Sequence, residues 1–239
     1  MTEMEIQQFF GVQTSADVPE YEITEPYQSN EDGKFVSHTL HERHTRGIHD
    51  SSEWHYKMDA FGNKMHLKLT RNTQTVKPGL ELETRHENGD ITRTPVNSHS
   101  LFHGKEISDP GSSVALSNDK GLTGMIKLSD ETLFVHPLPD HLANHVTSRN
   151  GGKPHLVYKK SAEPLHCQTK SGPGSNLAAA DKKYDVSDSS TNPVTHKYLQ
   201  VALVADENVA AKHGNQTADF LLVLANIVAG TFRDNSIGK

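Results

Sequence analysis

The stretch Lys64-Met-His-Leu-Lys-Leu-Thr70 alternates apolar and polar side chains along its whole length. Successive side chains of a β-strand point to opposite faces, so Met65, Leu67 and Leu69 share one face and the polar side chains share the other. This pattern is typical of an antiparallel sheet that is buried on one face and wet on the other. The stretch therefore predicts a half-buried antiparallel strand.

Short segments of the same kind lie on both sides of this strand. Turn-forming stretches separate them, among them Asn30-Glu-Asp-Gly33 and Asn88-Gly-Asp90. The predicted strands are residues 21–26, 34–41, 54–60, 64–70, 80–86, 91–95, 99–103, 113–116, 121–128, 132–137 and 155–159. The spacing predicts a β-rich, antiparallel domain over residues 1–160.

The composition changes after this region. Residues 161–195 are rich in Ser, Gly, Pro, Asn, Asp and Lys and show almost no apolar periodicity, which predicts a flexible linker. Limited proteolysis is expected to cut there first.

The last part of the chain, residues 196–239, has a different pattern. Leu199-Gln-Val-Ala-Leu-Val-Ala205 is a nearly continuous apolar run, which predicts a strand buried on both faces. Apolar residues then recur at helical spacing from Phe220 to Phe232. We interpret this part as the first strand and helix of an α/β domain that is otherwise missing. The sequence offers the helix no partner, so residues 201–239 are not expected to fold stably in this chain.

Composition and charge limit the classes of function. Only 33% of the 239 residues are hydrophobic, and the net charge of -6 is spread over both signs without a basic stripe, which argues against a nucleic-acid partner. No apolar run approaches the length of a membrane span, and residues 1–20 lack the pattern of a signal peptide. A single cysteine, Cys167, excludes an internal disulfide.

An ordered series of short motifs runs through both parts of the chain. Its main members in the β-rich part are Asp59-Ala-Phe-Gly-Asn-Lys-Met65, Phe102-His-Gly104, Gly111-Ser-Ser-Val-Ala-Leu-Ser117, Gly121-Leu-Thr-Gly-Met-Ile126 and His155-Leu-Val-Tyr-Lys159. This series resembles the prodomain of the ADAMTS metalloproteinases, which are secreted zinc enzymes related to the reprolysins. The tail, with Tyr198-Leu-Gln-Val-Ala-Leu-Val-Ala-Asp206 and Phe232-Arg-Asp-Asn-Ser-Ile-Gly238, resembles the opening strand and first helix of their catalytic domain.

The resemblance implies a fold and a function. The fold would be an antiparallel, β-rich prodomain, then a linker, then the first βα unit of an α/β metzincin-like catalytic domain. The parent protein would be secreted and would hydrolyse peptide bonds in extracellular-matrix or other secreted proteins with a zinc-bound water. The part present would act on its own catalytic domain, in folding and latency.

The catalytic signature of that family, H-E-x-x-H-x-x-G-x-x-H, does not occur in the 239 residues. The chain alone is therefore expected to have no peptidase activity. The alternative reading is a non-enzymatic, prodomain-like module that binds or inhibits a related protease, or the product of a truncated gene model.

Two departures from the family pattern are informative. Family prodomains usually carry cysteines where this chain has Ser100 and Asp119, so both partners of one disulfide are replaced together. The family also has a furin-type basic site before its catalytic domain, and the linker here offers only Lys182-Lys183 as a processing site.

Cys167 lies between the β-rich region and the tail, where related proenzymes carry an inhibitory cysteine. A thiolate is a strong zinc ligand and can occupy the water position of a catalytic zinc until the prodomain is removed. The segment lacks the Gly that often follows the inhibitory cysteine. An idle or intermolecularly paired thiol is the alternative.

The chain has 16 histidines, and several are closely spaced. His38, His41 and His44, with His49 and His55 nearby, have the residue type and spacing to bind a transition metal or to titrate as the secretory pathway acidifies. The alternative is a β-domain whose wet faces tolerate imidazole.

Two further sites come from the tail. Gln200 and Asp206 stand where family members carry acidic groups near a calcium site, and Gln contributes no charge, so that site would be weak. Both also fit simple polar residues at a strand end. Asn215-Gln-Thr217 is an N-glycosylation sequon, and Thr217 alternatively caps the following helix.

Overall fold

The computed structural model describes residues 1–41, 53–76, 79–96, 100–148, 151–159 and 201–232. Contacts divide the chain into two units, residues 1–160 with 205–239, and residues 161–204. All helices and strands of the described residues belong to the first unit.

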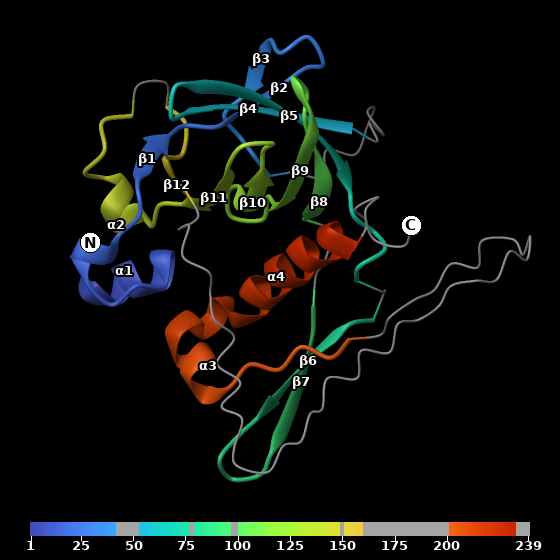
Figure 1. The fold of residues 1–239 in the computed structure, drawn as a ribbon. Helices are drawn as coiled ribbons and strands as arrows, with labels where there is room; N and C mark the ends of the chain where they lie inside the picture. Colours follow the sequence, from blue (N-terminus) through green and yellow to red (C-terminus); the bar gives the residue numbers. More distant parts are fainter. Residues whose placement is uncertain (42–52, 77–78, 97–99, 149–150, 160–200, 233–239) are drawn as a thin grey trace, which may run out of the picture. The chain divides into compact units, whose positions relative to one another are not determined.

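The first unit is built on one antiparallel sheet of ten strands (Figure 1). Its strand order is β1-β12-β11-β10-β9-β8-β5-β4-β2-β3, and sequence neighbours form most of the pairs. The strands are β1 (Tyr21–Thr24), β2 (Tyr27–Ser29), β3 (Phe35–Ser37), β4 (Glu53–Ala60), β5 (Asn63–Arg71), β8 (Leu101–Glu106), β9 (Asp109–Ser117), β10 (Thr123–Lys127), β11 (Thr132–Pro137) and β12 (His155–Lys159). The predicted β-rich, antiparallel fold is confirmed.

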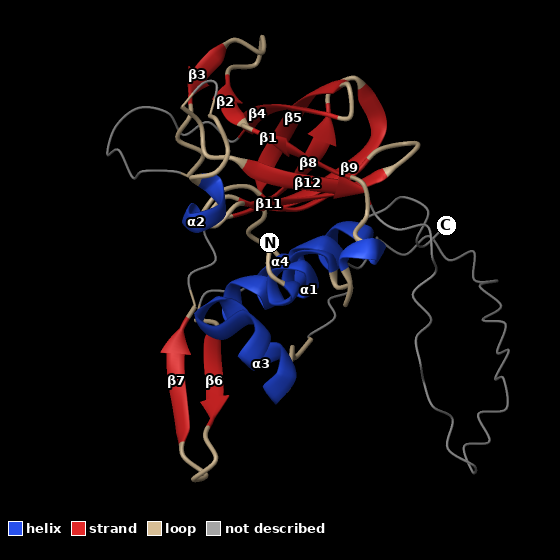
Figure 2. Cartoon of the chain, turned by 90° about the vertical axis from the view of Figure 1, so that its left-hand side faces the viewer, coloured by secondary structure: helices blue, strands red, loops and turns tan. Residues whose placement is uncertain are grey.

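The sheet curls, as Figures 1 and 2 show, so that strands far apart in its order come close. The β1 strand approaches β4 although the two are not paired. The backbone N–H of Phe61, just after β4, donates to the Glu22 carboxylate of β1 at 2.6 Å. A side chain of the edge strand β1 thus reaches the turn after β4, across the curl of the sheet.

The alternation that predicted β5 decides which face is inside. Met65, Leu67 and Leu69 are at most 2% exposed, and they lie in the apolar core inside the curl. A Cβ atom on Gly104 of β8 would collide with the Lys68 carbonyl oxygen of β5. The backbone approach of β5 and β8 therefore requires glycine in the Phe102-His-Gly104 motif.

A second, two-stranded sheet is formed by β6 (Glu81–Arg85) and β7 (Ile91–Pro95). This hairpin connects β5 to β8, and almost every residue in it is exposed. Glu83 makes ion pairs with Arg85 at 3.1 Å and Arg93 at 3.3 Å. These exposed contacts add little stability, so the hairpin depends on its base for support.

Two helices near the sheet were not predicted, α1 (Glu3–Phe10) and the short α2 (Asp140–Ala143). The α1 helix begins with a capping box, in which Thr2 and Glu5 exchange side-chain and backbone hydrogen bonds. Phe10 of this helix packs edge-on against Tyr158 of β12. The capping box was readable in the sequence as Thr-x-x-Glu.

The tail forms α3 (Glu207–His213), a 3-10 turn (Gly214–Gln216) and α4 (Thr217–Phe232). The predicted helix is confirmed, but two expectations about the tail are wrong. Residues 201–206 form neither helix nor strand. The helix also has a partner in this chain, because α4 contacts β8, β9 and β10.

Both corrections follow from what an apolar element needs in order to be buried. A strand that is apolar on both faces needs parallel neighbours, and the described residues provide none for residues 201–205. An apolar helix needs only an apolar surface, which the β8–β10 part of the sheet offers. Within the described part of the chain, no helix is long and apolar enough to cross a membrane.

Candidate functional site

The contact between α4 and the sheet is the most developed site in the described residues. Leu222, Val223 and Asn226 are the buried residues of α4. Leu222 belongs to a small apolar cluster with Val76 and Leu101, at the start of β8. Burying two aliphatic side chains stabilises such a contact by about 3 to 6 kcal/mol before its costs in entropy.

Asn226 is a fully buried polar residue on this apolar helix, with an exposed fraction of 0%. Its amide nitrogen donates to the carbonyl oxygens of Phe102 at 3.1 Å and Leu116 at 3.2 Å, one on each of β8 and β9. Its amide oxygen accepts a hydrogen bond from Asn72 at 2.7 Å. The imidazole Nε2 of His103 donates to the Asn226 backbone oxygen at 2.7 Å.

These bonds give the contact a specific register. A buried amide is costly unless its hydrogen bonds are made, and a helix shifted by one residue would leave this amide without them. The apolar residues supply attraction that is not directional, and Asn226 selects one position of the helix on the sheet. A Cβ atom at Gly230, one turn further on, would make ordinary van der Waals contact with His103 and Ala115.

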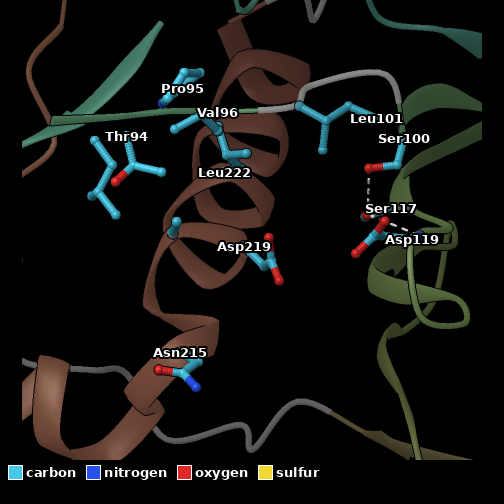
Figure 3. A pocket seen from close by; sticks show the side chains of 12 residues that line it. Thr94, Pro95, Val96, Ser100, Leu101, Ser117, Asp119, Asn215, Asp219 and Leu222 are labelled. Atoms are coloured by element: carbon cyan, nitrogen blue, oxygen red, sulfur yellow. Dashed lines mark hydrogen bonds between the residues drawn. The ribbon is translucent and has the colours of Figure 1, made fainter.

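A pocket of about 260 Å³ lies beside the amino-terminal half of α4 (Figure 3). Leu82 and Thr94 of the hairpin, Ser100 and Ser117 of the sheet, and Leu222 of α4 are among the residues that line it. The pocket is where three elements of the first unit meet. An exposed ion pair between Lys120 and Asp219, 3.0 Å long, links the sheet to the helix near this pocket.

Ser100 and Asp119, where the resemblance implies cysteines in related prodomains, both line this pocket (Figure 3). The Ser117 hydroxyl is 3.3 Å from the Ser100 hydroxyl, and the Asn118 backbone N–H donates to the Ser100 carbonyl oxygen at 3.0 Å. The two positions are therefore neighbours at one end of the β8–β9 pair. Hydrogen bonds of Ser117 with Ser100 and with the Asp119 N–H hold this end of the β8–β9 pair together.

The most buried histidine has a structural role. His155 of β12 is 0% exposed, its Nδ1–H donates to the Lys153 carbonyl oxygen at 2.7 Å, and its Nε2 accepts from the Leu122 N–H at 2.9 Å. Burial lowers the pKa of His155 to about 4. A Cβ atom at Gly121 would lie 2.7 Å from Nε2, which explains a glycine at the start of the Gly121-Leu-Thr-Gly motif.

A second, half-buried imidazole joins the sheet to α1. His136 of β11 lies between Tyr158, on which it stacks, and Phe9, whose ring meets it edge-on. Burial lowers the pKa of His136 to about 4, and His213 near the end of α3 adds to that shift. Both histidines are neutral at physiological pH, and the folded state loses stability as the pH falls because it binds their protons less well than the unfolded state does.

Only two of the candidate residues from the tail lie in the described residues. Asp206 is the N-cap of α3, and its carboxylate accepts a hydrogen bond from the Val209 N–H at 2.9 Å. Asn215 is exposed in the turn before α4, and the Thr217 hydroxyl donates to the Gly214 carbonyl oxygen at 2.7 Å. Cys167, Lys182, Lys183 and Gln200 lie outside the described residues, and so do His44 and His49.

The histidine group suggested by sequence spacing is brought together differently. His55 of β4 contacts His66 of β5, with 3.1 Å between Nδ1 of the first and Nε2 of the second. His66 was not a candidate, because its closeness to His55 depends on strand pairing and not on sequence spacing. No group of three or more His, Cys, Asp or Glu side chains that could hold a metal occurs among the residues the structure describes.

Comparison with known proteins agrees with the motif series. Residues 22–106, which span β1 to β8, match the profile described as the Reprolysin family propeptide. Similar proteins cover most of the chain. One of them, named "A disintegrin and metalloproteinase with thrombospondin motifs 3", from Homo sapiens, is 30% identical over 263 residues, and the match covers 92% of this chain. This chain is an ADAMTS-like propeptide region.

Two more relatives support this assignment. "A disintegrin and metalloproteinase with thrombospondin motifs 6" from Homo sapiens is 29% identical to the ADAMTS-like chain over 92% of its length. "A disintegrin and metalloproteinase with thrombospondin motifs 2" from Mus musculus is 30% identical over 77% of it. The chain spans only 21%, 23% and 16% of the lengths of these three relatives, about a fifth. The likeness therefore concerns one region of much longer proteins.

Proposed function

We propose that this chain is the precursor region of a secreted zinc metalloendopeptidase, and that it assists folding of its catalytic domain and keeps that domain latent. The observation that carries the proposal is the contact between α4 and the sheet. The helix belongs to the segment that resembles the start of the catalytic domain, and the sheet belongs to the propeptide. Asn226 joins the two through four hydrogen bonds.

A surface that holds this helix in one register supports a folding role. An isolated helix of 16 residues is marginal in water, and most helical stability in proteins comes from packing. A propeptide that supplies the packing surface early can hold the helix ready for the strands that follow. Leu224, Val228 and Phe232 leave 40%, 51% and 63% of their surface exposed on α4, so a further apolar face stays available.

Latency would involve Cys167 as the zinc ligand that excludes water. In the complete enzyme, bound zinc supplies an activated water for peptide-bond hydrolysis. The described residues do not provide a catalytic zinc site, and the H-E-x-x-H signature is not in the sequence. This chain's own contributions are therefore a thiolate and a covering surface.

The test uses the complete secreted precursor and a fluorogenic peptide substrate. Intact precursor should hydrolyse the peptide at least about tenfold more slowly than the same protein after cleavage within residues 161–195. Cys167→Ala should relieve much of this inhibition, while Gln168→Ala, one residue away, should leave it unchanged. Equal latency of wild type and Cys167→Ala would remove the thiolate role, and activity of the intact precursor equal to that of the cleaved form would refute latency itself.

Three finer proposals belong to the same function. Lys182-Lys183 would be the processing site, which amino-terminal sequencing of the secreted product would show. Asn215 would carry an N-glycan, because it is exposed, and glycosidase treatment would then reduce the mass of the secreted protein. Gln200 and Asp206 would contribute to a weak calcium site, for which Asp206 would have to share the carboxylate that caps α3.

The substrates would be proteins of the extracellular matrix or other secreted proteins. The rival function is a non-enzymatic module that binds or inhibits a related protease. It would use the same sheet surface to hold a helix of another protein. A transcript that continues into H-E-x-x-H supports the enzyme precursor, and a stop codon after Lys239 supports the rival.

A further inference from the structure

Three polar side chains meet where β2, β4 and β5 lie side by side, on the face of the sheet opposite the apolar core. Ser29 and His55 are direct partners in the β2–β4 pair. His66 is the diagonal neighbour of His55 in the β4–β5 pair, since the register joins His55 to Lys68 and Lys57 to His66. Ser29 is 5% exposed and His55 is 9% exposed, and His66 is half-buried.

The distances between the polar atoms are those of neighbouring metal ligands. The Nδ1 atom of His55 is 3.1 Å from Nε2 of His66, and the Ser29 hydroxyl oxygen is 3.3 Å from the same Nε2. Two nitrogens that each lie about 2.0 to 2.1 Å from a tetrahedral cation are about 3.3 Å apart. A cation can therefore replace the proton that the two imidazoles now share without a change of strand register.

The backbone of Asn30, in the turn after β2, favours the protonated form of the His66 imidazole, but burial, His55 and Lys57 act against that form more strongly. Burial is the main cause that lowers the pKa of His55 and of His66.

Charges of both signs surround the pair. Lys68 acts against positive charge at His55, and an ion pair of 2.9 Å with Glu53 offsets it. Lys57 acts against positive charge at His66, and Glu106 acts in favour of it.

We propose that His55 and His66, with the Ser29 hydroxyl, form a binding site for a divalent transition-metal cation such as zinc. Water would fill the remaining coordination positions, since no third His, Cys, Asp or Glu of the described residues joins the group. The site is separate from the catalytic zinc of the proposed enzyme and does not depend on that function. A bound cation would tie β2, and with it the exposed edge strand β3, to β4 and β5.

The test is a titration of the full 239-residue chain with zinc at neutral pH, followed by calorimetry and by nuclear magnetic resonance of the imidazole nitrogens. The expected result is one site at which the signals of His55 and His66 shift together. Cobalt at the same site should give the visible absorption of tetrahedral or five-coordinate cobalt. The affinity should fall as the pH is lowered, because protons compete for the same nitrogens.

His66→Gln and His55→Gln should each weaken this site by about tenfold or more. The matched control is His86→Gln, which changes an exposed histidine at the tip of the β6–β7 hairpin. Zinc affinity of His66→Gln within twofold of wild type would overturn the proposal. The resonance measurement needs no variant, so binding that leaves the His55 and His66 signals unmoved would overturn it even if a variant failed to fold.

Discussion

Asn226→Ala should release α4 from the sheet while the β-domain stays folded. The variant removes the amide that donates to the Phe102 and Leu116 carbonyl oxygens and accepts from Asn72. Removing one partner from a buried hydrogen bond costs about 1 to 3 kcal/mol for each polar group affected. Partial relaxation of the site lowers the sum, so we expect a loss of about 2 to 4 kcal/mol in the free energy of docking.

That loss is large beside the docking energy. The two buried aliphatic side chains of α4, Leu222 and Val223, contribute about 3 to 6 kcal/mol before ordering costs. The helix gains little from its own hydrogen bonds in water. The sheet does not depend on α4, because its core residues lie inside the curl. The loss should therefore be local.

Hydrogen exchange followed by mass spectrometry measures this directly. Peptides covering Thr217–Phe232 should exchange about 30-fold to 1000-fold faster in Asn226→Ala, since each 1.4 kcal/mol corresponds to a factor of ten. Peptides from β4 and β5 should keep their protection. The matched control is Thr231→Ala, an exposed residue of the same helix whose hydroxyl donates only to the Ile227 carbonyl oxygen. Exchange of α4 within threefold of wild type would refute the role given to Asn226.

Three other predictions concern the rest of the chain. Acidification should destabilise the fold, because burial lowers the pKa of His155 to about 4. The unfolded state therefore binds more protons than the folded state between pH 6.5 and 4. This histidine should lower the free energy of unfolding by about 1.4 kcal/mol at pH 5.5 and by about 3.4 kcal/mol below pH 4. Urea unfolding at pH 7.5 and 5.5 measures the difference, and His155→Gln should reduce it, whereas an identical pH dependence in that variant would contradict the assignment. The double variant Ser100→Cys/Asp119→Cys should form a disulfide in oxidising buffer and raise stability by about 2 to 4 kcal/mol; a free-thiol assay that finds both thiols unreacted would show that the two positions are not close enough. Limited proteolysis should cut first within residues 161–195, beside Lys182-Lys183, and early cuts in β5 would mean that the boundary is misplaced.

Local patterns predicted the sheet well. The alternation around Leu67 predicted a half-buried strand, and the same side chains are buried in the structure. The motif series also has a physical basis in particular residues. Gly104 permits the close approach of β5 and β8, and Gly121 leaves room for His155. The capping box that begins α1 has a local signal in Thr2 and Glu5.

The partner of α4 could not be found in this way. Asn226 looks like a polar interruption in an apolar helix, and it bonds to Asn72, which is 154 residues earlier in the chain. The His55–His66 pair is similarly a product of strand register. Cys167, Lys182, Lys183 and Gln200 lie outside the described residues, so their roles remain predictions.

The sequence by itself determined the elements whose signals lie within a few residues, namely the alternating strands and the apolar periodicity of α4. These depend on the directions in which neighbouring side chains point, and the backbone fixes those directions locally. The tertiary structure alone decided which surface covers α4, which carbonyl groups satisfy Asn226 and which histidines meet. Those outcomes depend on contacts between distant segments, since a buried amide or imidazole acquires its partners only when the sheet has formed.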